Sequence, residues 1–154
     1  MALVVNLQRR IKLDSKQFTV FCATLSSGIS EADNGDFSVA FVSDRRMKEL
    51  NSFFRDKDST TDVLSFPHEP EEFEQATIHL TDPSNQEARA NFLGDIVISV
   101  EQAQKQAEEN RLTLENEIKQ LILHGLLHLC GYDHETDSGE MNKRELQLRR
   151  KLKI

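Results

Sequence analysis

The sequence predicts an α+β fold, with a small mixed sheet of four strands packed against about five helices in a single domain. The length of 154 residues suits one domain. Strand-like and helix-like segments follow each other in the order β-α-β-α-β, a long loop, and then β-α-α-α. Residues 1–154 show no internal repeat and no second domain, so we expect one domain throughout.

The first half of the chain alternates predicted strands with predicted helices. Strands are expected where apolar residues cluster or alternate with small ones, over residues 3–8, 36–43 and 62–67. Helices are expected where apolar residues recur at i, i+3, i+4 and i+7. Asp14 or Ser15 can cap the first helix and Asp44 the second.

The second half contains one more strand and three helices. Residues 92–100 form an apolar strand, and residues 101–110 form a helix with few large side chains, which must lie near the surface. Thr113 can cap the next helix and Gly131 can end it. Because this helix is apolar almost all round in its second half, we expect it to be the central buried helix. A last helix is expected from Asp137 or Ser138.

Residues 68–91 show no clear period. The stretch from His68 to Glu87 has six acidic residues and no Lys or Arg. A long, partly mobile loop is therefore expected here, of a kind that is often functional. The sequence assigns it no role.

Composition limits the class of protein. The formal net charge of −7 argues against a protein that coats nucleic acid through charge alone. The start of the chain does not read as a signal peptide and no apolar run is long enough to span a bilayer, so we expect a cytoplasmic protein without a membrane partner. Cys22 and Cys130 are expected to be buried thiols in a reducing compartment.

Three of the five histidines fall within HGLLHLCGYDH, residues 124–134. His124 and His128 are four residues apart on the predicted central helix, so both imidazoles project from one face. Gly131 can turn the chain so that His134 approaches the same point. The alternative is two core histidines and a surface His134, but the spacing favours a metal site.

Three imidazoles with one open position are typical of catalytic zinc. Zinc is the default ion, one per chain, although imidazole ligands also suit nickel, copper and iron. Such an ion would lower the pKa of its bound water toward ~7. Cys130 lies two residues from His128 and should point away from the histidine face.

The spacing of the histidines and the glycine matches the metzincin protease pattern H-E-x-x-H-x-x-G-x-x-H, with one exception. Gly125 stands where those proteases carry the glutamate that acts as general base. Peptide hydrolysis is therefore disfavoured.

The full string HGLLHLCGYDH resembles the YbeY family of metal-dependent endoribonucleases, the rRNA maturation factors. Two other stretches resemble family segments in the same order: FFRDKDSTTDVLSFP (residues 53–67) and LGDIVIS (residues 93–99). The resemblance runs from about Phe37 to Leu148.

This resemblance implies a single α+β domain whose metal is held by His124, His128 and His134. It implies cleavage of single-stranded RNA, maturation of the 3′ end of small-subunit rRNA and ribosome quality control. The implied partners are rRNA, the small ribosomal subunit and its assembly factors. The family's important arginine falls on Arg55, and His124 is expected to be catalytic as well, because its loss should remove metal and activity together.

Arg55 is the candidate for stabilising the phosphate, because a guanidinium can neutralise phosphoryl charge with two hydrogen bonds. From the residues alone a surface arginine at a helix end is the favoured interpretation, and the family resemblance reverses this preference. Asp133 could orient an imidazole or only shape a turn, and Lys57 and Asp58 could help to place RNA. The remaining expectations are a basic groove of Arg55 and Lys57 with Arg45 or Arg46, a structural Asp95, a solvent-exposed loop histidine at His68, and no context for His79.

Two alternatives to an endoribonuclease stay open from the sequence. One is a metal-dependent hydrolase of another substrate, such as a peptide or a small molecule. The other is a non-catalytic ribosome-assembly factor with a structural metal. A closed structural site normally has four protein ligands, and the sequence offers three.

Overall fold

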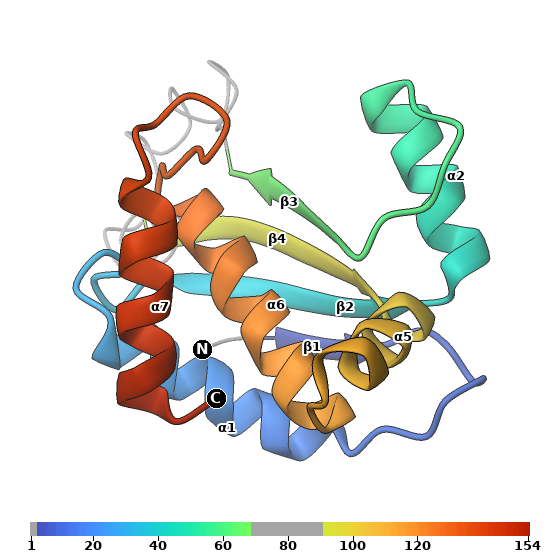
Figure 1. Cartoon of the computed structure of the whole chain (residues 1–154), viewed down its shortest axis with the longest axis horizontal. Coiled ribbons are helices and arrows are strands. Elements are labelled where there is room, and N and C mark those ends of the chain that lie inside the picture. Colours follow the sequence, from blue (N-terminus) through green and yellow to red (C-terminus); the bar gives the residue numbers. More distant parts are fainter. Residues whose placement is uncertain (1–2, 69–90) are drawn as a thin grey trace, which may run out of the picture.

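The computed structural model describes residues 3–68 and 91–154, and their arrangement confirms the predicted α+β fold (Figure 1). These residues form a single small domain with one mixed sheet. The strands are β1 (Leu3–Asn6), β2 (Asp36–Val42), β3 (Val63–Pro67) and β4 (Phe92–Ser99). The helices are α1 (Ser15–Gly28), α2 (Asp44–Arg55), α5 (Val100–Asn110), α6 (Leu114–Leu129) and α7 (Glu140–Leu152).

The strands lie in the order β1-β2-β4-β3. The first three are parallel neighbours, and β3 pairs antiparallel with β4 at the edge of the sheet. Gly94 makes this last pairing possible. Its φ is +142°, and a Cβ there would lie 2.3 Å from the carbonyl oxygen of Phe66 on β3. A larger residue would push the edge strand away.

Helix α6 crosses one face of the sheet and forms the centre of the larger core (Figure 1). The expected central buried helix is confirmed, since its apolar side chains from Ile118 to Leu129 are buried almost completely. Helix α1 lies on the same face, where Phe18 packs edge-on against Phe41 of β2 with ring centroids 5.2 Å apart. Helix α7 packs against α6.

The opposite face of the sheet carries a smaller core beneath α2. Met47 of α2 packs there with Val42 of β2 and Leu64 of β3. Side chains alternate along β2, so Phe41 points into the larger core and Val42 into the smaller one. The C-terminal end of α2 is thereby held beside the edge strand β3.

The helix caps agree only in part with expectation. Asp14 and Thr113 accept the predicted hydrogen bonds, from the backbone N–H groups of Lys16 and Asn116. The prediction that Asp44 caps α2 is wrong, because Ser43 Oγ accepts the capping hydrogen bond from Arg46 N. Asp44 instead accepts a hydrogen bond from Ser99 Oγ at 3.1 Å, which ties α2 to the end of β4.

Some boundaries also differ. Strand β1 ends at Asn6, because the side chain of Gln8 turns back to bond Asn6 and Ile11. Val100 begins α5 instead of ending the preceding strand. Helix α7 starts at Glu140, after Asp137, whose carboxylate accepts from the N–H groups of Gly139 and Met141. These bonds hold the pKa of Asp137 below its ordinary value.

Residues 69–90, which include most of the expected acidic loop and His79, lie outside the described residues. In the ranges that are described, no helix combines the length and the apolar character needed to cross a bilayer.

Candidate metal centre

Helix α6 carries His124 and His128 on the face that looks toward the edge strand β3. Both rings are half-buried, whereas His134 is exposed on the turn that follows the helix. The buried leucines on the other faces of α6 fix the rotation of the helix about its axis. The same apolar pattern that places α6 in the core therefore points both imidazoles into the space beside β3.

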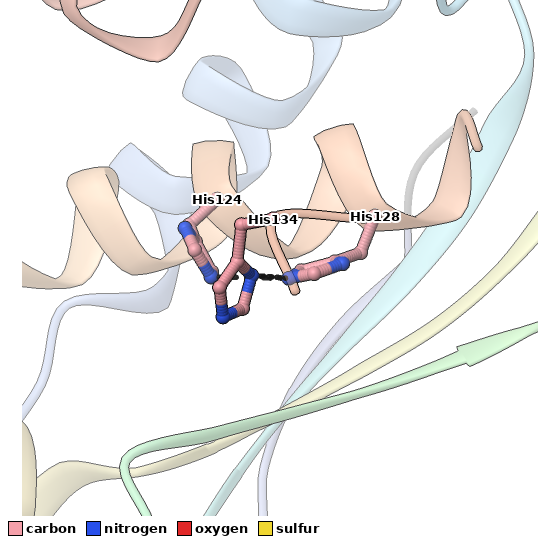
Figure 2. Close-up of side chains that lie close together, drawn as sticks. All are labelled: His124, His128 and His134. Atoms are coloured by element: carbon pink, nitrogen blue, oxygen red, sulfur yellow. Dashed lines mark hydrogen bonds between the residues drawn. The ribbon is translucent and has the colours of Figure 1, made fainter. Parts of the chain in front are cut away.

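The three imidazoles converge on one point, as predicted (Figure 2). His128 Nε2 lies 3.2 Å from His124 Nε2 and 3.2 Å from His134 Nδ1. One ring nitrogen from each histidine lies within 4.8 Å of the other two. Two nitrogens bound tetrahedrally to zinc at ~2.0–2.1 Å are about 3.3 Å apart, so the spacing suits a shared ion.

The outer nitrogens of the two helical histidines have acceptors. His124 Nδ1 lies 2.7 Å from Glu145 Oε1, and His128 Nδ1 lies 3.0 Å from the carbonyl oxygen of Tyr132. An acceptor at Nδ1 favours the tautomer that carries its proton there and leaves Nε2 free to bind a cation. Each helical imidazole could thus bind a cation through its Nε2 atom.

Burial and the nearby His124 lower the pKa of His128 below its ordinary value. The neutral imidazole is the form that binds metal. The three histidines fit a metal ion by this chemistry, by their convergence and by their outer hydrogen bonds.

Gly131 lets the chain turn so that His134 can return to the helical pair. Its φ is +104°, and its N–H donates to the carbonyl oxygen of His128 at 3.1 Å. The next residue, Tyr132, donates its hydroxyl to Glu31 Oε2 at 3.1 Å. Arg144 of α7 donates two hydrogen bonds to the same carboxylate, at 2.7 and 2.8 Å. The turn is therefore anchored to two distant segments.

The Arg144 guanidinium lowers the pKa of Glu31 to about 2. The Glu31 carboxylate in turn raises the pKa of Arg144. Desolvation raises the pKa of the Tyr132 hydroxyl, and the Glu31 carboxylate raises it further. The acid is therefore charged, and the hydroxyl protonated, at neutral pH.

The cysteines are not part of this centre. Burial raises the pKa of Cys22 to about 12 and that of Cys130 to about 11, so both are protonated thiols. Both are free, as expected, although Cys130 is only half-buried.

Gly125 faces the sheet at its closest approach to α6. A Cβ at this position would lie 3.0 Å from Ile96 Cγ2 and 3.1 Å from Ser65 Oγ. The protease glutamate is thus absent from a position that has little room for any side chain. This geometry agrees with the expectation that the site lacks the metzincin base.

The histidines open onto a cleft that encloses about 900 Å³. Its walls come from β3, from the end of α2 and from the turn after α6, and they include Phe54, Arg55, Lys57, Asp62, the three histidines, Asp133 and Glu135. The structure therefore brings Arg55 and Lys57 to the same cleft as the three histidines. Arg55 is the last residue of α2, and Asp56 follows it with a left-handed φ of 54°.

The basic groove is smaller than predicted. Arg45 and Arg46 do not line the cleft, because they stand at the opposite end of α2, where Arg46 pairs with Glu49 at 2.9 Å. Asp58 pairs with Lys48 at 3.8 Å and does not line the cleft either. Two cations, Arg55 and Lys57, and three carboxylates line the cleft, so the cleft is not strongly basic.

The sequence model of the family described as endoribonuclease YbeY matches residues 4–153. The chain belongs to this family. The YbeY protein of Nautilia profundicola is 45% identical over 119 residues, which cover 77% of this chain and 73% of the relative. That of Alkaliphilus metalliredigens is 39% identical over 147 residues, covering 91% and 87%.

A solved structure shares the YbeY fold of this chain. The solution structure of TM1509 from Thermotoga maritima superposes with a TM-score of 0.60 at 26% identity, over 96% of this chain and 85% of the other. The YbeY family depends on a metal, and the three histidines of this chain form a cluster that could bind one.

Glu145 is the residue of this YbeY chain that sequence reasoning missed. It lies on α7, is 6% exposed, and bonds His124 with one oxygen and Arg149 Nη2 with the other at 2.9 Å. A pattern could have revealed it: Met141, Glu145 and Leu148 form the buried stripe of α7, and an acid in such a stripe needs a partner.

Three further residues singled out from the sequence are structural or lie outside the cleft lining. Asp133 shapes the turn, since its carboxylate accepts from Glu135 N at 3.0 Å. Asp95 accepts a hydrogen bond from Ser38 on the neighbouring strand, as suits a structural residue. His68 is exposed and outside the cleft lining, where its ring contacts Phe92, so the expectation of a solvent-exposed histidine is confirmed.

Proposed function

We propose that this chain is a metal-dependent endoribonuclease that cleaves single-stranded RNA. We further propose that it matures the 3′ end of small-subunit rRNA and acts in ribosome quality control. The observation that supports this most strongly is the convergence of three imidazole nitrogens at the wall of a cleft that also holds an exposed arginine. Membership of the endoribonuclease YbeY family supports the same activity.

His124, His128 and His134 would hold the metal, with zinc as the favoured ion and nickel or another divalent transition metal as the alternatives. A bound ion of this kind makes hydroxide available near neutral pH and neutralises charge on a phosphate. His124 counts as catalytic through this binding. Glu145 and the Tyr132 carbonyl orient the two helical imidazoles.

Arg55 would bind the scissile phosphate. Its side chain is exposed at the cleft, and within residues 3–68 and 91–154 no carboxylate forms a salt bridge with it. A free guanidinium can give two parallel hydrogen bonds to phosphoryl oxygens, which gain negative charge as cleavage proceeds. Lys57, beside it in the cleft, would contact a neighbouring phosphate.

The small ribosomal subunit and its assembly factors are the partners we propose, and the cytoplasm is the compartment. Two free thiols suit a reducing compartment. Binding to the subunit would also help an acidic protein of net charge −7 to reach RNA.

The deciding experiment measures turnover of single-stranded RNA by the purified protein, with casein as a parallel substrate. We expect RNA cleavage that a chelator abolishes and one divalent metal restores, and no cleavage of casein. Casein hydrolysis without RNA cleavage would instead favour a hydrolase of another substrate. Stoichiometric metal with no turnover on RNA would favour a non-catalytic assembly factor.

A further inference from the structure

Two neighbouring aromatic side chains are exposed at the C-terminal end of α2. Phe53 is 82% exposed and Phe54 is 56% exposed. The Phe53 and Phe54 ring centroids are 4.8 Å apart, and Phe54 lies 5.1 Å from Phe66 of β3, both in edge-to-face contact. The three rings form a continuous row that leads from the edge strand out into solvent.

This row is continuous with the cleft. Phe54 lines the cleft directly, together with Arg55, Lys57 and the three histidines. Helix α2 buries Met47 against the sheet and Asn51 against the loop carbonyl of Ser59, so its packing does not need Phe53. An exposed apolar side chain, next to cations that line the same cleft as the three histidines, suits a ligand with both flat apolar faces and negative charge.

The charges of the cleft indicate that RNA affinity needs a contribution besides electrostatic attraction. Arg55 and Lys57 line the cleft together with three carboxylates, and the whole chain has a net charge of −7. Attraction of a phosphate backbone by charge alone is therefore weak. Stacking of bases on aromatic rings adds affinity that does not depend on net charge and tolerates any sequence.

We propose that Phe53 and Phe54 form a stacking platform for unpaired RNA bases, with the adjoining backbone phosphates held by Arg55 and Lys57. The inference rests on the proposed RNA-cleaving function and names a feature that selects its substrate. In a duplex the base faces are already stacked and unavailable, whereas in a single strand they can be splayed onto side chains. The platform would therefore favour single strands over duplexes.

The test measures binding by fluorescence anisotropy with the metal-loaded protein. The probe is a fluorescein-labelled 2′-O-methyl oligouridylate, checked on a gel for integrity after each titration. The comparison probes are the same backbone with abasic sites at its centre and a duplex of equal length. The variants are Phe53→Ala, Phe53→Leu and Phe53→Trp. Val20→Ala, at an apolar α1 residue that is 68% exposed and outside the cleft, is the matched control.

We expect Phe53→Ala and Phe53→Leu to weaken binding of the intact single strand about fivefold or more, and Phe53→Trp to retain it. With the abasic probe and with the duplex, these two variants should bind as tightly as the wild type, since neither probe offers free base faces. The dependence of affinity on salt should stay unchanged in Phe53→Ala and should decrease in Lys57→Gln, because only the lysine would displace counterions. Val20→Ala should bind as the wild type does.

Equal RNA affinity of the wild type and Phe53→Ala would overturn the platform and would favour a protein contact at this patch. A loss of equal size with the abasic probe, or in Phe53→Trp, would also overturn it. If the wild type cleaves RNA while these variants behave identically, only the platform fails. If the wild type neither binds these probes nor cleaves an unmodified single-stranded RNA, the proposed function fails with it.

Discussion

Glu145 Oε1 lies 2.7 Å from His124 Nδ1, which joins the terminal helix to the candidate metal centre. The acid comes from α7 and the histidine from α6, so the contact is made only when the two helices pack. The other oxygen of Glu145 accepts from Arg149 on the same helix. The carboxylate is thereby held on both sides.

Replacing Glu145 with Gln should lower zinc affinity by about 10- to 100-fold, the usual range for a residue that orients a metal ligand. An amide group can donate to Nδ1 and stabilise the wrong tautomer of His124. Competition with a chromophoric chelator measures the affinity. Arg149→Met is the control, because it removes the outer ion pair and keeps the bond to His124. Equal zinc affinity in Glu145→Gln and the wild type would rule out the orienting role.

Removal of a proposed metal ligand should weaken metal binding more than the Glu145→Gln change does. His124→Ala is expected to lose stoichiometric metal and RNA cleavage together, because two imidazoles hold an ion much less firmly than three. Metal analysis after dialysis and a cleavage assay measure the two losses. His68→Ala, at an exposed histidine outside the cleft, should keep both. A metal-loaded, active His124→Ala protein would contradict the three-histidine site.

Arg55→Ala should retain metal and lose cleavage by about 10²- to 10³-fold, the usual effect of removing one group that stabilises developing charge. Arg55→Lys should recover only part of the rate, since an ammonium cannot give the paired hydrogen bonds of a guanidinium. Single-turnover cleavage rates at saturating metal make the comparison. Arg46→Ala, in a pair outside the cleft, is the control. RNA cleavage by Arg55→Ala at the wild-type rate would show that Arg55 does not stabilise the phosphate.

The Glu31–Arg144 pair should make stability depend on pH. The pKa of Glu31 is lowered from 4.5 to about 2 in the folded protein, so its contribution is fully present above about pH 4.5 and is lost as the pH falls toward 2. Glu31→Gln should cost about 1–2 kcal/mol of unfolding free energy near neutral pH, with the difference shrinking in acid. Urea denaturation at several pH values measures it.

The matched control is Glu49→Gln, which breaks the pair between Arg46 and Glu49, whose side chains are 61% and 54% exposed. Such a surface pair contributes at most about 0.5 kcal/mol. If Glu31→Gln and Glu49→Gln are equally stable near neutral pH, the anchoring of the turn by Glu31 is not supported.

Gly125→Glu restores the protease consensus but should not create a protease. The new Cβ would lie 3.0 Å from Ile96, and overpacking of this kind costs about 1–3 kcal/mol before any carboxylate is buried. Thermal unfolding and a casein assay test both statements. Gly28→Ala is the control, since a Cβ at the end of α1 meets no neighbour within 4 Å and should be tolerated. An active protease of wild-type stability would contradict this account.

Much of the fold could be predicted from local patterns. Apolar residues at helical spacing identified the central helix, and alternation of Phe37, Val39 and Phe41 with smaller residues identified β2. The histidine spacing predicted convergence, because a helix of known pitch puts residues four apart on one face and Gly131 permits the turn. These features depend on residues close together in the chain.

Other features depend on packing between distant segments, which no local pattern encodes. Nothing near His124 indicates that its partner is Glu145, since 21 residues and a turn separate them. The failure of Arg45 and Arg46 to reach the cleft follows from the length and direction of α2, because only residues at the end of this helix line the cleft. The convergence of the three histidines, the elements and their apolar faces could thus be predicted from the sequence alone. The partners that orient the ligands, and the aromatic row beside the cleft, depend on how α2 and α7 dock, because hydrogen bonds and exposure are set by neighbours that only the folded chain brings together.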